Sequence, residues 1–88
     1  MSEIGRAVMK ELVEFIVKSL VDQPDEVHAV EIQSGTTTIV ELSVAQADMG
    51  RVIGKGGRII NSIRRLLQVA ASRQGKRVSL ELIEDDYS

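Results

Sequence analysis

The chain has 88 residues, 43% of them hydrophobic and 27% charged, which fits one small folded domain better than a disordered segment. It has no cysteine and one histidine, which excludes disulfides, thiolate nucleophiles and cysteine-based zinc sites, so we expect neither a metal nor a cofactor. Apolar runs fall short of the roughly 20 residues that cross a bilayer, and the first residues do not resemble a secretion signal, so we expect a cytoplasmic protein.

The charged residues are distributed unevenly along the chain. The net charge is −2, yet the segment from Arg51 to Arg77 contains eight of the 11 basic residues and none of the 13 acidic ones. Those basic residues are Arg51, Lys55, Arg58, Arg64, Arg65, Arg73, Lys76 and Arg77. A basic segment in an otherwise acidic chain is typical of a surface that attracts an anionic partner.

The first 20 residues have apolar side chains at helical spacing, which predicts an amphipathic helix. Ser2 is a suitable N-cap, and Pro24 ends the helix because proline disfavours helical backbone at the residue before it. The expected core face consists of Ile4, Val8, Leu12, Phe15, Ile16 and Leu20.

Two segments rich in β-branched residues, 27–33 and 37–44, flank Ser34-Gly35-Thr36 and predict a hairpin. Side chains alternate between the two faces of a strand, which assigns one set to the core and leaves Glu31, Glu41 and Ser43 toward water. The expected core set is Val30, Ile32, Thr38, Val40, Leu42 and Val44.

The second half of the chain predicts a short helix over 45–52, a longer helix over 58–73 and a third strand containing Val78, Leu80 and Leu82. The order α-β-β-α-α-β predicts an α+β fold in which the helices pack on one face of a three-stranded sheet. We expect one domain over residues 1–88, with a disordered acidic tail at 84–88.

The longer helix has a wide apolar face. We expect its sheet-facing line to contain Ile59, Ile63, Leu66 and Ala70, and its flank to contain Ile60, Leu67 and Ala71. The flank either forms a protein interface or packs under the N-terminal helix.

Between the two helices lies the loop Gly54-Lys55-Gly56-Gly57. Its glycines allow a ligand to approach the main chain, and the loop leads into a helix N-terminus, where free N–H groups favour an anion. Lys55 and Arg58 add positive charge, so the loop predicts a phosphate site. The alternative is a helix cap and tight turn without a ligand.

The spacing excludes the common nucleotide-binding loops. Only three residues separate Gly50 from Gly54, and Gly56 occupies the position of the magnesium-binding hydroxyl of a P-loop. Ile59 replaces the third glycine of the dinucleotide fingerprint. We therefore expect no small-molecule substrate.

The motif Ile53-Gly54-Lys55-Gly56-Gly57 between two helices resembles the Ile-Gly-x-x-Gly marker of KH domains. The predicted order of elements resembles the type II, bacterial form of that fold. The whole chain is similar to the small bacterial single-KH RNA-binding proteins of the KhpA type, through residues 16–22, 24–27, 48–55 and 75–78.

The resemblance implies a non-enzymatic protein that holds about four nucleotides of single-stranded RNA against the loop, with the bases over an apolar groove. Two aromatic residues cannot form the stacking platform of other RNA-binding folds. The matched loop positions are Gly54, Lys55, Gly56 and Gly57. Charge and proximity add Arg51 and Arg58, and the expected groove floor consists of Val52, Ile53, Val40 and Leu42.

The resemblance further implies a homodimer, or a heterodimer with a larger KH-containing protein, through helix 58–73. It also implies a post-transcriptional or RNA-chaperone role linked to cell shape. The alternative is a protein-interaction adaptor with incidental RNA contact. The remaining basic residues are interpreted as a solvated surface: Arg64, Arg65, Arg73, Lys76 and Arg77.

Overall fold

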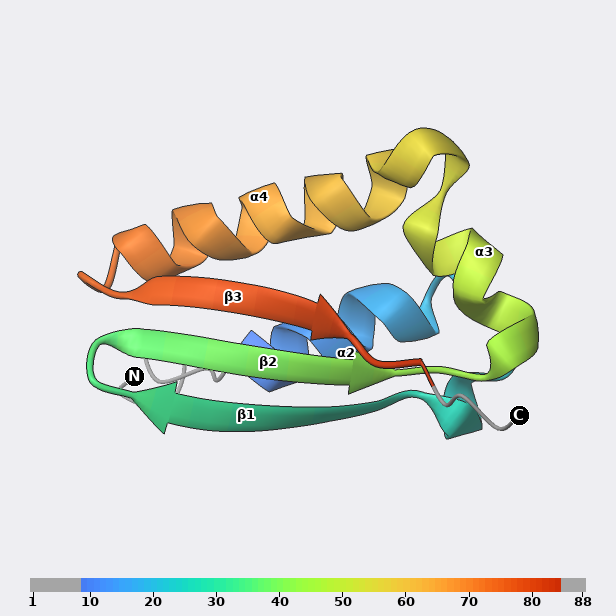
Figure 1. Ribbon diagram of the computed structural model, residues 1–88, viewed down its shortest axis with the longest axis horizontal. Helices are drawn as coiled ribbons and strands as arrows, with labels where there is room; N and C mark the ends of the chain where they lie inside the picture. The colour runs from blue at the N-terminus through green and yellow to red at the C-terminus, as the bar shows by residue number, and fades with distance from the viewer. Residues whose placement is uncertain (1–8, 85–88) are drawn as a thin grey trace.

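The computed structural model describes residues 9–84, in which helices cover one face of a three-stranded sheet (Figure 1). In chain order the elements are α2 (Met9–Lys18), β1 (His28–Ser34), β2 (Thr37–Ser43), α3 (Met49–Ile53), α4 (Arg58–Ser72) and β3 (Arg77–Leu82). They are connected in part by 3-10 turns at Pro24–Glu26, Gln46–Asp48 and Lys55–Gly57. This arrangement confirms the predicted α+β fold class and order of elements.

The sheet has the strand order β1-β2-β3. β1 pairs antiparallel with β2 through the hairpin, and β3 pairs parallel with β2 after the crossover through α3 and α4. α2 packs against β1 and β2, while α4 packs against β3 and α2 (Figure 1). The crossover therefore places α4 beside the free edge of β3, with the glycine loop at the opposite end of the helix from the start of that strand.

The core fills the space between the sheet and the helices. Val40 and Leu42 of β2 have no exposed surface and share one apolar cluster with Val13 of α2, Leu67 of α4 and Leu80 of β3. Burying each such side chain contributes on the order of 1.5–3 kcal/mol. The rest of the buried cluster consists of Met9, Val17, Val27, Ala29, Val52, Ile60 and Ile63.

The prediction for the faces of β1 is wrong. Val30 is 55% exposed, whereas Ala29 is buried, because the hairpin register pairs Ala29 with the buried Leu42. Ile32 is exposed for the same reason, and the half-buried Glu31 lies on the helix-covered face. Its carboxylate accepts a hydrogen bond from the Met9 N–H at 3.0 Å. The inner positions of this edge strand therefore include a polar contact to α2.

The predicted core face of the N-terminal helix is also wrong in part. Met9, Val13 and Val17 are buried, while Phe15 is 72% exposed. At about 100° per residue, Phe15 lies on the side opposite the stripe of buried residues that are four apart. Leu20 is likewise exposed, and Leu12 and Ile16 are partly buried against the core. The predicted positions Ser2, Ile4 and Val8 and the tail residues 85–88 lie outside the described residues.

The prediction for the α4 apolar face is right for Ile63 and wrong for Ile59 and Leu66. Ile60, Ile63, Leu67 and Ala71 are buried, whereas Ile59 and Leu66 are exposed. α4 leans toward β3 and α2 along the 60–63–67–71 line, which leaves the neighbouring line toward solvent. None of the helices formed by residues 9–84 is long and apolar enough to cross a membrane.

Candidate nucleic-acid interface

The glycine loop is a tight turn built on left-handed backbone. Gly54 ends α3 with φ 77°, and Gly56 and Gly57 follow with φ 64° and 79°. The Gly57 N–H donates to the Gly54 carbonyl at 3.1 Å and closes the turn. Side-chain-bearing residues rarely adopt these angles, so the three glycines are required by the backbone itself.

Two of these glycines have different surroundings. A Cβ atom at Gly54 would lie 2.6 Å from Cγ1 of Ile59, so this position must stay bare for the loop to meet the first turn of α4. A Cβ atom at Gly56 would meet nothing within 4 Å. The main chain at Gly56 is thus open to a ligand, beside the exposed side chains of Lys55 and Arg58.

Arg51 does not extend this positive surface. Its guanidinium lies 2.8 Å from the Asp22 carboxylate and 3.3 Å from the buried Asp48 carboxylate. Asp48 also accepts the main-chain N–H groups of Asp22 and Gln23 at 3.2 and 3.0 Å. The cluster ties the segment after α2 to α3, and because the charge of Arg51 is paired there, we remove Arg51 from the candidate site.

The prediction for the groove floor is also wrong in part. Val52, Val40 and Leu42 have no exposed surface, because they belong to the apolar cluster between the sheet and the helices, and so they cannot touch a ligand. Val52 supports the loop from inside the core. Ile53 is half-buried and is the member of the predicted floor that retains exposed surface.

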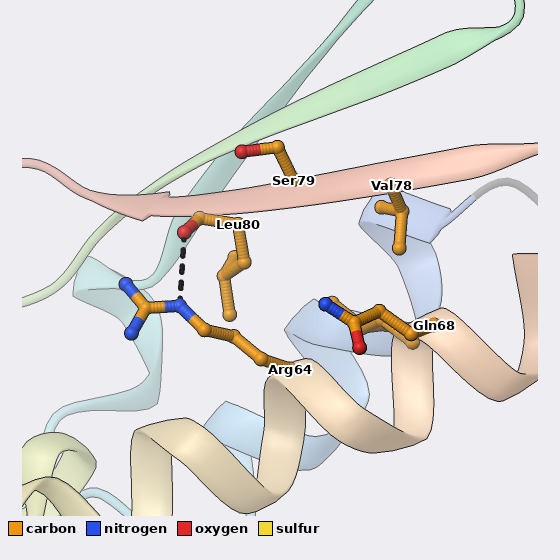
Figure 2. Close-up of a pocket in the computed structure, with 6 residues that line it drawn as sticks. Arg64, Gln68, Val78, Ser79 and Leu80 are labelled. Atoms are coloured by element: carbon orange, nitrogen blue, oxygen red, sulfur yellow. Dashed lines mark hydrogen bonds between the residues drawn. The ribbon is translucent and has the colours of Figure 1, made fainter.

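A groove lies instead between α4 and the edge of β3. A pocket there is lined by Arg64, Leu67, Gln68, Val78, Ser79 and Leu80. Figure 2 shows Arg64 and Gln68 of α4 reaching toward β3, with Val78 and Leu80 facing them and Ser79 pointing away. Arg64 donates from Nε to the Leu80 carbonyl and from Nη1 to Asn61 Oδ1, both at 3.2 Å.

The groove on this polar side of α4 was not predicted from the sequence. Asn61, Arg64, Gln68 and Ser72 are spaced by three or four residues, which places them along one side of α4. The sequence shows the helical spacing of these residues, but their place in a groove depends on which strand lies beside α4. The parallel pairing of β3 with β2 supplies that information.

The basic side chains beside the loop and the groove are free of carboxylate partners within the described part of the chain, where the ion pairs all involve Arg51. Residues 9–84 also contain no group of three or more His, Cys, Asp or Glu side chains that could hold a metal ion. The described surface at the loop is therefore suited to an anion through its own cations and main-chain N–H groups.

A family model described as KhpA/KhpB, KH domain, matches residues 10–82, which include the loop, α4 and β3. The chain belongs to the KhpA/KhpB family of KH domains. Membership confirms the resemblance inferred from the glycine motif and the order of elements.

Relatives in this family are similar over nearly their whole length. The RNA-binding protein KhpA of Chlamydia trachomatis is 53% identical over 77 residues, which cover 88% of this chain and 99% of the relative. The KhpA protein of Borreliella burgdorferi is 48% identical over 84 residues, which cover 96% of this chain and all of the relative. The KhpA protein of Clostridium perfringens is 51% identical and covers 85% of this chain.

A solved structure supports the fold alone. The crystal structure of Aquifex aeolicus Era bound to GDP and aluminium fluoride superposes with a TM-score of 0.59 at 19% identity. The match covers 84% of this chain and 29% of the Era chain.

Proposed function

We propose that this KhpA/KhpB-family domain binds single-stranded RNA, with the sugar-phosphate backbone against the Gly54–Gly57 loop and the bases in the groove between α4 and β3. The observation that carries the proposal is the open main chain at Gly56, which is flanked by Lys55 and Arg58 and precedes the helix whose side lines the groove. The names of the KhpA relatives support RNA as the ligand class.

The loop residues have separate roles in this proposal. Gly54 and Gly57 set the turn, Gly56 admits the phosphate chain, and Lys55 and Arg58 supply positive charge. Ile53 offers an apolar contact beside the loop. The bases then meet Val78 and the polar side chains of Arg64 and Gln68 across the groove.

The role that follows is non-catalytic and needs no metal or nucleotide cofactor. We infer a single domain over residues 1–88 that acts in the cytoplasm on RNA as a chaperone or post-transcriptional regulator. KH domains take about four nucleotides, so one copy reads little sequence, and useful specificity requires two linked copies.

The binding proposal is tested with Gly56→Asp, which places a carboxylate where the phosphate chain would pass. Gly35→Asp is a matched control, because Gly35 has φ 62° against 64° for Gly56, and a Cβ atom added at Gly35 would also meet nothing within 4 Å. Both variants carry the same charge and similar backbone strain. In titrations with a four-nucleotide RNA, Gly56→Asp should bind at least tenfold more weakly than the unchanged protein. Gly35→Asp should bind with the affinity of the unchanged protein. Equal affinities for the two variants would contradict the proposal.

A second role, self-association or pairing with a larger KH-containing protein, is favoured by an exposed apolar line on α4. Leu66 is 57% exposed, and Ile59 and Val69 on the same side of the helix are also exposed. The expected interface residues Ile60 and Leu67 are buried in the core and cannot contribute. This line lies away from the β3 groove, so a partner on it leaves the proposed RNA surface free.

A further inference from the structure

The face of the sheet that points away from the helices is open. Within residues 9–84, the helices lie on one face of the sheet and leave the other face uncovered (Figure 1). Because side chains alternate along a strand, the neighbours of the buried Ala29, Val40 and Leu80 point to this open face. The two strand registers place six side chains beside one another there: Val30, Ile32, Ile39, Glu41, Ser79 and Glu81.

Three of these side chains form a continuous apolar patch. Ile32 pairs directly with Ile39 across β1 and β2, and Val30 lies two positions before Ile32 on the same face. Val30 is 55% exposed and Ile32 is 41% exposed, while Ile39 is half-buried between the neighbouring strands. A sheet face that meets only water carries polar side chains. A contiguous apolar patch on an open face therefore indicates an interaction surface.

Two carboxylates border this apolar patch. Glu41 pairs with Val30 on one side and with Glu81 on the other, and neighbouring strands lie about 4.8 Å apart. Like charges at directly opposed positions destabilise a sheet. Among the described residues all ion pairs involve Arg51, so neither carboxylate has a basic partner there. Arg77 is on the same face but four positions before Glu81, about 13 Å along the strand.

The charge of the open face selects its occupant. Phosphate groups of RNA would be repelled by the two carboxylates. A second copy packed face to face would place the same carboxylates against each other, because a two-fold interface joins identical surfaces. A lysine or arginine side chain between Glu41 and Glu81 can instead donate hydrogen bonds to both. The surface is therefore complementary to a cationic partner with apolar side chains.

The dimensions of the face match one helix. Three strands about 4.8 Å apart give a surface about 10–14 Å wide, and a helix with its side chains is about 10–12 Å across. Seven residues each in β1 and β2 correspond to a length of about 23 Å, which a helix of about 16 residues covers. An amphipathic helix can place its apolar residues on such a face at spacings of three and four.

We propose that the open face of the sheet binds a basic amphipathic helix of a partner protein. The apolar side chains of that helix pack on Val30, Ile32 and Ile39, and a lysine or arginine pairs with Glu41 and Glu81. The glycine loop and the α4–β3 groove lie outside this surface. The inference consequently does not rest on the proposed function, and an RNA and a protein helix could occupy the chain together.

The test uses a displayed library of helical peptides of about 16 residues, in which leucine, alanine, lysine and glutamate are equally frequent at every position. Peptides are selected on the immobilised full chain, and the enriched ones are titrated by fluorescence anisotropy. We expect enriched peptides to contain lysine in preference to glutamate, with leucines at spacings of three and four. Enrichment of acidic peptides, or of none above an uncoated surface, would overturn the proposal.

A pair of charge variants shows where the enriched peptides bind. Glu41→Gln with Glu81→Gln removes both carboxylates of the open face. Glu11→Gln with Glu26→Gln is the matched control, because it removes the same charge from exposed positions on α2 and in the 3-10 turn. Circular dichroism confirms that both variants are folded. We expect the first variant to bind the peptides about tenfold more weakly and the control to bind within about twofold of the unchanged chain.

A third variant tests the apolar patch. Val30→Thr with Ile32→Thr keeps side chains branched at Cβ, which suit a strand, and makes the patch polar. It should also weaken peptide binding by about tenfold. Peptide affinities that are equal across all three variants would overturn the proposal. If instead the unchanged chain self-associates and the threonine variant is monomeric, a second copy occupies this face and the proposal is wrong. Weaker RNA binding by the threonine variant alone would likewise assign the face to RNA.

Discussion

A Cβ atom on Gly54 would overlap Ile59, at 2.6 Å from its Cγ1 atom, whereas a Cβ atom on Gly56, two residues later, would meet nothing within 4 Å. The first glycine is fixed by the packing of the loop on α4. The second is fixed only by its left-handed backbone angle. Substitution at the two positions should therefore have different consequences.

Gly54→Ala should lower the free energy of unfolding by about 2–4 kcal/mol, because steric overlap adds to the cost of a positive φ. Gly56→Ala should lower it by only about 1–2 kcal/mol, the cost of left-handed backbone for alanine. Urea denaturation followed by circular dichroism measures both. Equal losses at the two positions would contradict the packing role assigned to Gly54.

Asp48 should stabilise the fold more than its partner Arg51 does. Asp48→Ala removes a buried carboxylate and leaves the N–H groups of Asp22 and Gln23 without their acceptor in a part-buried site, so we expect a loss of about 3 kcal/mol. Arg51→Gln removes two ion pairs of a half-exposed guanidinium but leaves both N–H groups on Asp48, and it should cost less than about 1 kcal/mol. Thermal unfolding of the two variants checks the order, and a larger loss for Arg51→Gln would contradict it.

The exposed line on α4 predicts opposite outcomes for adjacent leucines. Leu66→Lys should give a folded protein that loses self-association, because Leu66 faces solvent in one chain. Leu67→Lys should unfold the domain, because Leu67 has no exposed surface. Light scattering and circular dichroism distinguish these results. The interface assignment fails if the unchanged protein is monomeric at high concentration or if Leu66→Lys remains a dimer.

Arg64 and Arg65 should differ in their effect on RNA binding. Arg64 lines the groove and reaches the Leu80 carbonyl, whereas Arg65 is exposed and does not line the groove. Arg64→Gln should weaken binding of a four-nucleotide RNA by about tenfold, because its contact with a base across the groove is lost. Arg65→Gln should change the affinity less than twofold. Similar losses in both variants would indicate diffuse charge attraction in place of a groove contact.

The order of elements was predictable because periodicity and turn residues mark each one. The buried face of β1 was not predictable from the sequence. Val30 and Ile32 are apolar and Glu31 between them is polar, and this alternation favours burial of Val30 and Ile32. The hairpin register places Ala29 inward, and α2 uses the inward Glu31 as a hydrogen-bond acceptor. A pattern of hydrophobicity carries no information about such a tertiary polar contact.

The candidate site was likewise predictable only in part. The glycine loop was predictable, because glycine clusters between helices are rare unless the backbone needs them. The groove was not predictable, because its expected floor included Val52 and Val40, which are fully buried once the helices pack on the sheet. Arg64 and Gln68 gain their place in it through the parallel pairing of β3, a contact between residues distant in sequence.

The central claim is that RNA lies along the loop and the α4–β3 groove, and mapping of amide NMR shifts during titration with a four-nucleotide RNA tests it most directly. We predict that the largest shifts occur at Lys55–Arg58, with further shifts at Val78 and Leu80. The amides of Val30 and Ile32, on the opposite face of the sheet, should stay unchanged. Shifts concentrated on that face or on α2, with the loop amides unmoved, would contradict the claim.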